Sequence, residues 1–396
     1  MIFASNSAGQ SDGHYRALDS LRGIAAILVC LYHFKVNSHL AGFAIVRNAW
    51  MFVDFFFVLS GFVICLAYAR RLGQGKPGEF KAFAIRRFGR IYPLHLVMLL
   101  LFLAFELLTL AMPGLRSGPA FGEGKSIGDF GLTLFLLNCF GLADNLKWNT
   151  PSWSIAAEWW TYLAFAAAAV LAGRRLPLAL SAMAAIGLAV MVANLPSMYA
   201  VYDYGFWRCL LGFSAGALVA TGWSFLEPQL RRFSNLVWHG IETILLLAVI
   251  WMVSELAHSG WSFLSPLLFA ACVAAVAVER GWVSRLLLAA PLLFAGKISY
   301  GIYMVQALII ARFENLLTLG ERALGIALKG PATFAEAGSE RMVAGASFWQ
   351  GDLMTVLLLA MVLIAATLSY HFIEEPGKRW AARLADKARH RPAEAS

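Results

Sequence analysis

The chain is dominated by apolar runs, each about as long as a helix that crosses a lipid bilayer. A hydrocarbon core about 30 Å thick requires roughly 20 mainly apolar residues per helix. The chain is 60% hydrophobic, above the roughly 45–50% of soluble domains. We therefore predict an all-α polytopic membrane protein with ten transmembrane helices, at residues 17–36, 50–69, 92–112, 153–172, 177–194, 205–222, 238–257, 263–279, 292–312 and 352–372.

The lysines and arginines between these runs predict which side of the membrane each loop faces. Cytoplasmic loops are enriched in Lys and Arg, and a ten-span arrangement puts most of these residues on the side of both termini. Residues 1–16 are then a cytosolic segment, 17–372 the ten-span domain, and 373–396 a basic cytosolic tail. The apolar segment Phe130–Phe140 is too short to span comfortably, and counting it would place the later basic loops outside. We expect it to be re-entrant or interfacial.

Charge and cysteine content exclude several other classes of protein. The net charge of +9 is compatible with a nucleic-acid partner, but the basic residues cluster between apolar segments, as membrane loops do. We expect a lipid bilayer, and no nucleic acid, as partner. The five cysteines lie far apart within apolar stretches, without the spacing of a metal site or a disulfide framework. We expect buried free thiols and no metal ion, and no small-residue site for cleavage of a signal peptide.

The first run, LDSLRGIAAILVCLYHF, carries ionisable side chains where hydrocarbon is expected. Arg22 and His33 are eleven residues apart, which places them within roughly 20° on one helix face and about 16 Å apart along its axis. Ionisable groups within a span usually face a bundle interior or a watery cavity, at a functional site. The alternative is that Arg22 snorkels to the headgroups and that His33 is a satisfied interior histidine.

Three more ionisable residues lie at the expected depth of His33. Counted from the outer ends of their runs, Asp54, Glu158 and Arg208 are four to six residues into the membrane. A common level predicts a shared pocket, in which a carboxylate would hold the imidazole in one tautomer so that it can accept a proton from a hydroxyl nucleophile. Asp54 and Glu158 both remain candidates for that partner. The alternatives are an interfacial carboxylate for Asp54 and an aromatic belt around Glu158.

A basic segment, KAFAIRRFGRIYPLH, precedes the third run. Arg87 and Arg90 in it have i, i+3 spacing and lie on one helical face. Paired guanidinium groups suit bidentate binding of phosphate. Such a cluster also acts as a determinant of topology or as a contact to anionic lipids, so the sequence alone leaves both interpretations open.

Several motifs follow one another along nearly the whole chain, from residue 15 to about 380. They are the Arg22–His33 pair with ten residues between, VDFFFVLSGF (53–62), RRFGRIYPL (86–94), WSIAAEWWTYL (153–163), SYGIYMVQ (299–306) and SYHFIEEPGKR (369–379). As a set they resemble the acyltransferase-3 family of bacterial integral-membrane O-acyltransferases, which act on cell-envelope polysaccharides, antibiotics and related acceptors.

The resemblance implies ten spans, an acyl-CoA donor taken from the cytosol, functional roles for Arg22 and His33, and a cytosolic arginine pair that serves the donor. No appended extracytoplasmic esterase-like domain is expected after the last span. The expected site residues are His33, Asp54 and Glu158 for catalysis, Arg22, Arg87 and Arg90 for the donor, and Arg208, Tyr300 and Tyr303 for the substrate.

The favoured function is therefore that of a membrane O-acyltransferase in the bacterial cytoplasmic membrane, which moves an acyl group, most simply acetyl, from acyl-CoA to a saccharide or lipid-linked saccharide. The rival is a carrier or flippase that uses the same polar interior for an anionic or sugar-bearing substrate. The sequence leaves open the acceptor, the acyl group, direct attack or a covalent histidine intermediate, and the oligomeric state. The segment 313–351 is either part of the acceptor site or a connector.

Overall fold

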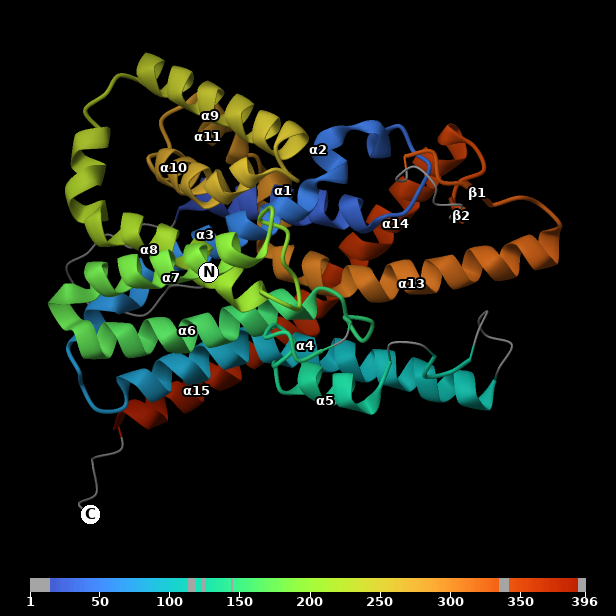
Figure 1. Cartoon of the computed structure of the whole chain (residues 1–396), viewed down its shortest axis with the longest axis horizontal. Helices are drawn as coiled ribbons and strands as arrows, with labels where there is room; N and C mark the ends of the chain where they lie inside the picture. The colour runs from blue at the N-terminus through green and yellow to red at the C-terminus, as the bar shows by residue number, and fades with distance from the viewer. Residues whose placement is uncertain (1–14, 113–118, 123–124, 144, 335–341, 391–396) are drawn as a thin grey trace.

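The computed structural model describes residues 15–112, 119–122, 125–143, 145–334 and 342–390, and these form an almost entirely helical bundle (Figure 1). Two short antiparallel strands, β1 (Lys329–Pro331) and β2 (Met342–Ala344), pair with Gly330 opposite Val343. The helices are α1 (Arg16–His33), α2 (Ala44–Arg47), α3 (Phe52–Gly73), α4 (Glu79–Ala111), α5 (Ile127–Leu134), α6 (Ser152–Ala172), α7 (Leu176–Asn194), α8 (Gly205–Leu230), α9 (Asn235–Glu255), α10 (Ser265–Ala277), α11 (Trp282–Leu287), α12 (Ala290–Lys297), α13 (Ser299–Leu324), α14 (Phe348–Ser369) and α15 (Glu375–His390).

Eight helical stretches in the described part of the chain are long and apolar enough to cross a membrane. One of them, Ser152–Asn194, holds two helices, α6 and α7, because the chain turns at Gly173 with a φ of +51°. α1 is not among the eight, since its 18 residues include Arg16, Asp19 and Arg22. Each of the ten expected spans thus overlaps a helix, and the all-α polytopic fold is confirmed.

The structure corrects the start of one expected span and shows the helix in the short apolar segment. The expected span 292–312 begins too early, because α12 ends at Lys297 and α13 starts at Ser299. α5 overlaps the first part of the short apolar segment Phe130–Phe140 and has only eight residues, far fewer than a bilayer requires.

The residues after the last span form a helix that packs along the first half of α4. α15 lies beside α4 (Figure 1), and a Cβ atom added to Gly89 would meet the Cβ of Ala381 at 2.1 Å. Arg86 pairs with Asp386, and Arg389 pairs with Glu79 at 2.9 Å. The pair of helices is therefore a rigid support for the basic segment that carries Arg87 and Arg90.

Glycines let α3 and α8 approach one another at backbone distance. A Cβ on Gly61 would lie 1.9 Å from the carbonyl oxygen of Phe213, and one on Gly216 would lie 1.8 Å from that of Val58. Small residues at such crossings are the usual means of tight helix packing in membranes. This contact fixes the register of the two helices and so brings Asp54 of α3 next to Arg208 of α8.

α1 lies against α12, α13 and α3 and connects the two ends of the bundle. Arg22 of α1 is within electrostatic range of Arg90, and we name the end of the bundle that holds Arg87 and Arg90 the arginine end; α1 stops at His33. The opposite end, where α3, α6 and α14 begin, is named the histidine end. All five cysteines are free, and four of them are buried, in agreement with the sequence-based expectation.

Candidate active site

Arg22 is held at the junction between α12 and α13. Its Nε donates to the Ser299 hydroxyl at 2.9 Å, one Nη2 hydrogen goes to the Gly296 carbonyl at 3.0 Å, and Asp19 lies 3.1 Å from the same nitrogen. α1 reaches this junction because a Cβ on Gly23 would lie only 2.5 Å from the backbone nitrogen of Gly296. The Gly296 carbonyl belongs to the last turn of α12, where a cation is favoured.

Arg87 and Arg90, expected to serve the donor, both lie at the arginine end. Arg87 donates to the Tyr68 hydroxyl at 3.1 Å and stands over the ring of Tyr68 at 5.1 Å. Arg90 donates to Glu374 at 3.1 Å and stands over the ring of Tyr300 at 5.5 Å. Stacking on aromatic rings fixes the planes of the guanidinium groups.

Two lysines at this end were not among the expected site residues. Lys297 and Lys378 both lie 4.9 Å from the centre of the Tyr370 ring, and Lys378 pairs with Glu375 at 3.0 Å. The segment Tyr370–Glu374 is a single π-helical turn, a feature that is frequent at functional sites. The motif SYHFIEEPGKR contains this segment, and the structure places the segment and α15 against α4.

We name the five basic residues at this end the cationic cluster: Arg22, Arg87, Arg90, Lys297 and Lys378. Arg22 is within electrostatic range of Arg90, Glu374 and Glu158, and Lys378 is within range of Arg90. Within the described residues, the Nε of Arg87 and the Oε1 of Glu374 are buried without a hydrogen-bond partner. Buried polar atoms are rarely left unpaired, so the cluster has capacity to bind a ligand.

Glu158 belongs with the cationic cluster and not with His33. Its carboxylate engages the hydroxyls of Ser60 and Tyr162, which are 2.9 Å from each other, and it is within electrostatic range of Arg87 and Arg90. The level expected to be common to Glu158 and His33 is therefore not found for Glu158, because residue counts along a helix do not show which neighbouring helices a side chain meets.

Asp54 and Arg208 form a buried pair at the histidine end. Arg208 donates from Nε to Oδ1 at 2.7 Å and from Nη2 to Oδ2 at 3.0 Å, and the two side chains are 1% and 0% exposed. Its Nη1 donates to the Ala200 carbonyl at 2.8 Å, and Nη2 also donates to the Trp50 carbonyl at 3.2 Å. The rings of Trp50 and Trp153 flank the guanidinium. Asp54 and Arg208 therefore lie at one level, as expected. Their contacts, however, are to each other, to backbone carbonyls and to the two tryptophan rings.

His33 is oriented by a backbone carbonyl and not by a carboxylate. Its Nδ1 lies 2.8 Å from the carbonyl oxygen of Val29, so Nδ1 carries the hydrogen and Nε2 keeps its lone pair in the neutral ring. Tyr32 meets the ring edge-on at 4.9 Å. The expected pairing of His33 with Asp54 or Glu158 is wrong. The carbonyl of Val29 instead selects one tautomer of the His33 ring, which is the role expected of the carboxylate.

Tyr300 and Tyr303 lie one turn apart on α13, between the two ends. The Tyr300 hydroxyl donates to the Ile91 carbonyl of α4. The Ser154 hydroxyl donates to the Pro151 carbonyl, so the Tyr303 hydroxyl donates to Ser154, at 2.7 Å. Tyr303 is within electrostatic range of both Arg208 and Glu158, so α13 carries polar groups from the cationic cluster towards the histidine end.

The chain resembles known acyltransferases over most of its length. Residues 15–371 match a family model described as an acyltransferase domain. The peptidoglycan O-acetyltransferase OatA of Listeria monocytogenes is 24% identical over 91% of this chain and 55% of its own length. Acyltransferase MdmB of Streptomyces mycarofaciens is 26% identical over 92% and 91%. The putative peptidoglycan O-acetyltransferase YrhL of Bacillus subtilis is 23% identical over 92% and 55%.

The chain thus spans about half the length of the two peptidoglycan O-acetyltransferases and nearly all of the Streptomyces protein. No solved structure matches it.

Proposed function

Because the chain belongs to the acyltransferase-3 family of membrane proteins, we propose that it transfers an acyl group, acetyl in the simplest case, from cytosolic acyl-CoA to a hydroxyl of a saccharide acceptor. Two relatives are named as peptidoglycan O-acetyltransferases, one of them putatively, and peptidoglycan is a saccharide polymer. The bacterial cytoplasmic membrane, with the arginine end facing the cytosol, gives the enzyme access to both substrates.

The cationic cluster is the observation that carries this proposal. Coenzyme A is a polyanion with three phosphate groups, and guanidinium pairs bind phosphate through two parallel hydrogen bonds. The unpaired Nε of Arg87 and the stacked guanidinium of Arg90 supply such donors. Arg22 stands deeper in the bundle and is held in place by Gly296 and Ser299, so it suits the pantetheine amides of the donor. The arm of the donor would then extend along α1 and present its thioester carbonyl near His33.

His33 supplies the base. Its Nε2 takes the proton of the acceptor hydroxyl as the oxygen bonds to the thioester carbonyl, the C–S bond breaks, and CoA leaves as the thiol with that proton. The Val29 carbonyl stabilises the imidazolium through the Nδ1 hydrogen bond. In the covalent variant Nε2 attacks the thioester carbonyl, the C–S bond breaks and CoA leaves as the thiolate. The acceptor hydroxyl then takes the acyl group from Nε2, the N–acyl bond breaks, and the hydroxyl proton goes to the CoA thiolate.

The test is turnover of the thioester. Purified protein in detergent, given acetyl-CoA and a saccharide acceptor, should release free CoA, and Arg87→Ala together with Arg90→Ala should raise the acetyl-CoA concentration required. Release that depends on the acceptor supports transfer. A protein that moves saccharide across vesicle membranes without releasing CoA would be a carrier, and the proposal would fail.

A further inference from the structure

A group of aromatic side chains surrounds a histidine–aspartate pair at the histidine end. The His39 ring lies 5.2 Å from Phe348 and 5.0 Å from Trp349, and Phe334 lies 5.9 Å from Phe348. Trp349 is 79% exposed, Phe334 is 40% exposed and Phe348 is 36% exposed. We name these four residues, with Asp352, the aromatic platform.

Asp352 holds His39 by both of its oxygens. One accepts from the His39 backbone nitrogen at 2.9 Å, and the other lies 2.6 Å from Nδ1 of the ring. Nδ1 therefore carries the hydrogen, and Nε2 is left as an acceptor on a side chain that is 56% exposed. This is the carboxylate-oriented imidazole that the sequence predicted for His33, six residues further along the chain.

The platform is fixed to the end of α1. Asn37 is 6% exposed and donates to the carbonyls of Pro331 and Gly345, while its own backbone nitrogen donates to Ala344. A Cβ on Gly351 would lie 1.8 Å from the carbonyl oxygen of Asn37. The loop after α1, the β1–β2 ribbon and the start of α14 are thus locked together.

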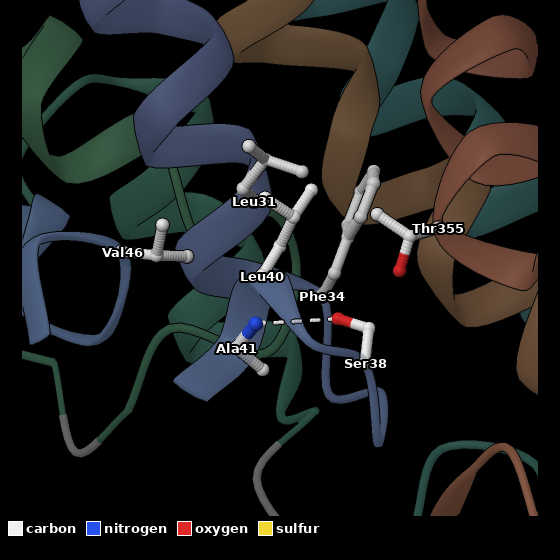
Figure 2. A pocket seen from close by; sticks show the side chains of 7 residues that line it. All are labelled: Leu31, Phe34, Ser38, Leu40, Ala41, Val46 and Thr355. Atoms are coloured by element: carbon white, nitrogen blue, oxygen red, sulfur yellow. Dashed lines mark hydrogen bonds between the residues drawn. The ribbon is translucent and has the colours of Figure 1, made fainter. Parts of the chain in front are cut away.

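A small cavity lies beside the end of α1, and chain neighbours of His33 and of His39 line it. Figure 2 shows the residues that line it. Leu31 and Phe34 are close to His33 in the chain, Ser38 and Leu40 are the chain neighbours of His39, and Thr355 lies on α14. The cavity volume of about 10 Å³ is close to that of one water molecule. The loop that carries His39 therefore packs against the last turn of α1.

We propose that the aromatic platform is where the saccharide acceptor binds, an inference that rests on the proposed acyl transfer. A sugar ring has an apolar face of C–H groups that packs on an indole and a rim of hydroxyls that bond to imidazole and carboxylate, and the platform offers both. Exposed aromatic rings also occur in the lipid-facing belt of membrane proteins. A belt, however, has no need of an imidazole oriented by a carboxylate with its second nitrogen open.

The experiment measures binding without any acyl donor, so that it does not depend on turnover. Full-length protein in nanodiscs is titrated calorimetrically with chitotetraose and with cellotetraose. Trp349→Ala should weaken binding about 10-fold, on the order of 1.4 kcal/mol, whereas Trp349→Phe, which keeps a ring, should lose less. His39→Leu should weaken binding as well, through the loss of its hydrogen bonds.

Trp261→Ala is the matched control. Trp261 is 65% exposed in the connection between α9 and α10, near the same end, but outside the platform, and its removal should leave the affinity unchanged. The proposal is overturned if neither tetrasaccharide binds, if Trp349→Ala binds as the wild type does, or if Trp261→Ala weakens binding equally. Platform-dependent binding without CoA release would overturn the acyl transfer and leave the platform as a saccharide site.

Discussion

Removal of both members of the buried Asp54–Arg208 pair should destabilise the protein no more than removal of either one alone. Asp54→Leu leaves a guanidinium buried at 1% exposure without its counterion, a change that costs about 3–5 kcal/mol. Arg208→Met leaves a buried carboxylate, and protonating a carboxyl of ordinary pKa near 4 at pH 7 costs about 4 kcal/mol. The double variant removes both charges and leaves unpaired the carbonyls of Trp50 and Ala200, at about 1–3 kcal/mol each.

The free energy of unfolding, measured by titration with SDS from a mild detergent, separates these cases. We expect the double variant to be no less stable than either single variant, which requires a coupling of several kcal/mol. We also expect the folded double variant to keep the KM of the wild type for the acceptor, because the pair contacts the scaffold. Single losses that simply add in the double variant, or a large rise in acceptor KM at wild-type stability, would refute the reasoning.

Three further predictions follow from the fold and the cationic cluster. Arg87→Ala with Arg90→Ala should raise the KM for acetyl-CoA about 10-fold or more while membrane insertion is kept, and Lys replacements should recover only part of it, since an ammonium lacks the bidentate fork; an unchanged KM would make the pair a topology signal only. Gly216→Val should sharply reduce the folded yield, because the added Cβ would lie 1.8 Å from the Val58 carbonyl, and a normal yield by size-exclusion chromatography would contradict that packing. Reporter fusions after Arg90 and at the C-terminus should be cytosolic and one after Gly325 exported, and a cytosolic signal at Gly325 would refute the ten-span topology.

The sequence was sufficient for the fold class because apolar length and loop charge are local properties. Each expected span overlaps a helix, and the shared face of Arg22 and His33 follows from helical periodicity within α1. The break between α12 and α13 was missed because Lys297 is a single charged residue in the apolar run, and the break at the apolar Ile298 leaves no mark in the hydropathy. The helix that follows α14 was missed because its burial depends on contact with α4.

The site was predicted less well because depth along a helix is not position in space. Asp54 and Arg208 do meet, but Glu158 turns towards Arg87 and Arg90. The oriented imidazole was attributed to a carboxylate near His33, whereas Val29, four residues earlier on the same helix, supplies the acceptor. A backbone carbonyl has no sequence signature, so this partner was not accessible from residue types. Lys297 and Lys378 meet at the ring of Tyr370, a contact between segments about 80 residues apart that the sequence does not reveal.

The central claim is that His33 takes the proton of the acceptor as the acyl group leaves CoA. The most direct measurement is a rapid quench of labelled acetyl-CoA with acceptor, for the wild type and for His33→Ala in detergent. Loss of a general base lowers rates by about 10²–10⁴-fold, so the variant should bind acetyl-CoA as the wild type does and transfer label more slowly by that factor. Transfer by His33→Ala at the wild-type rate would contradict the account.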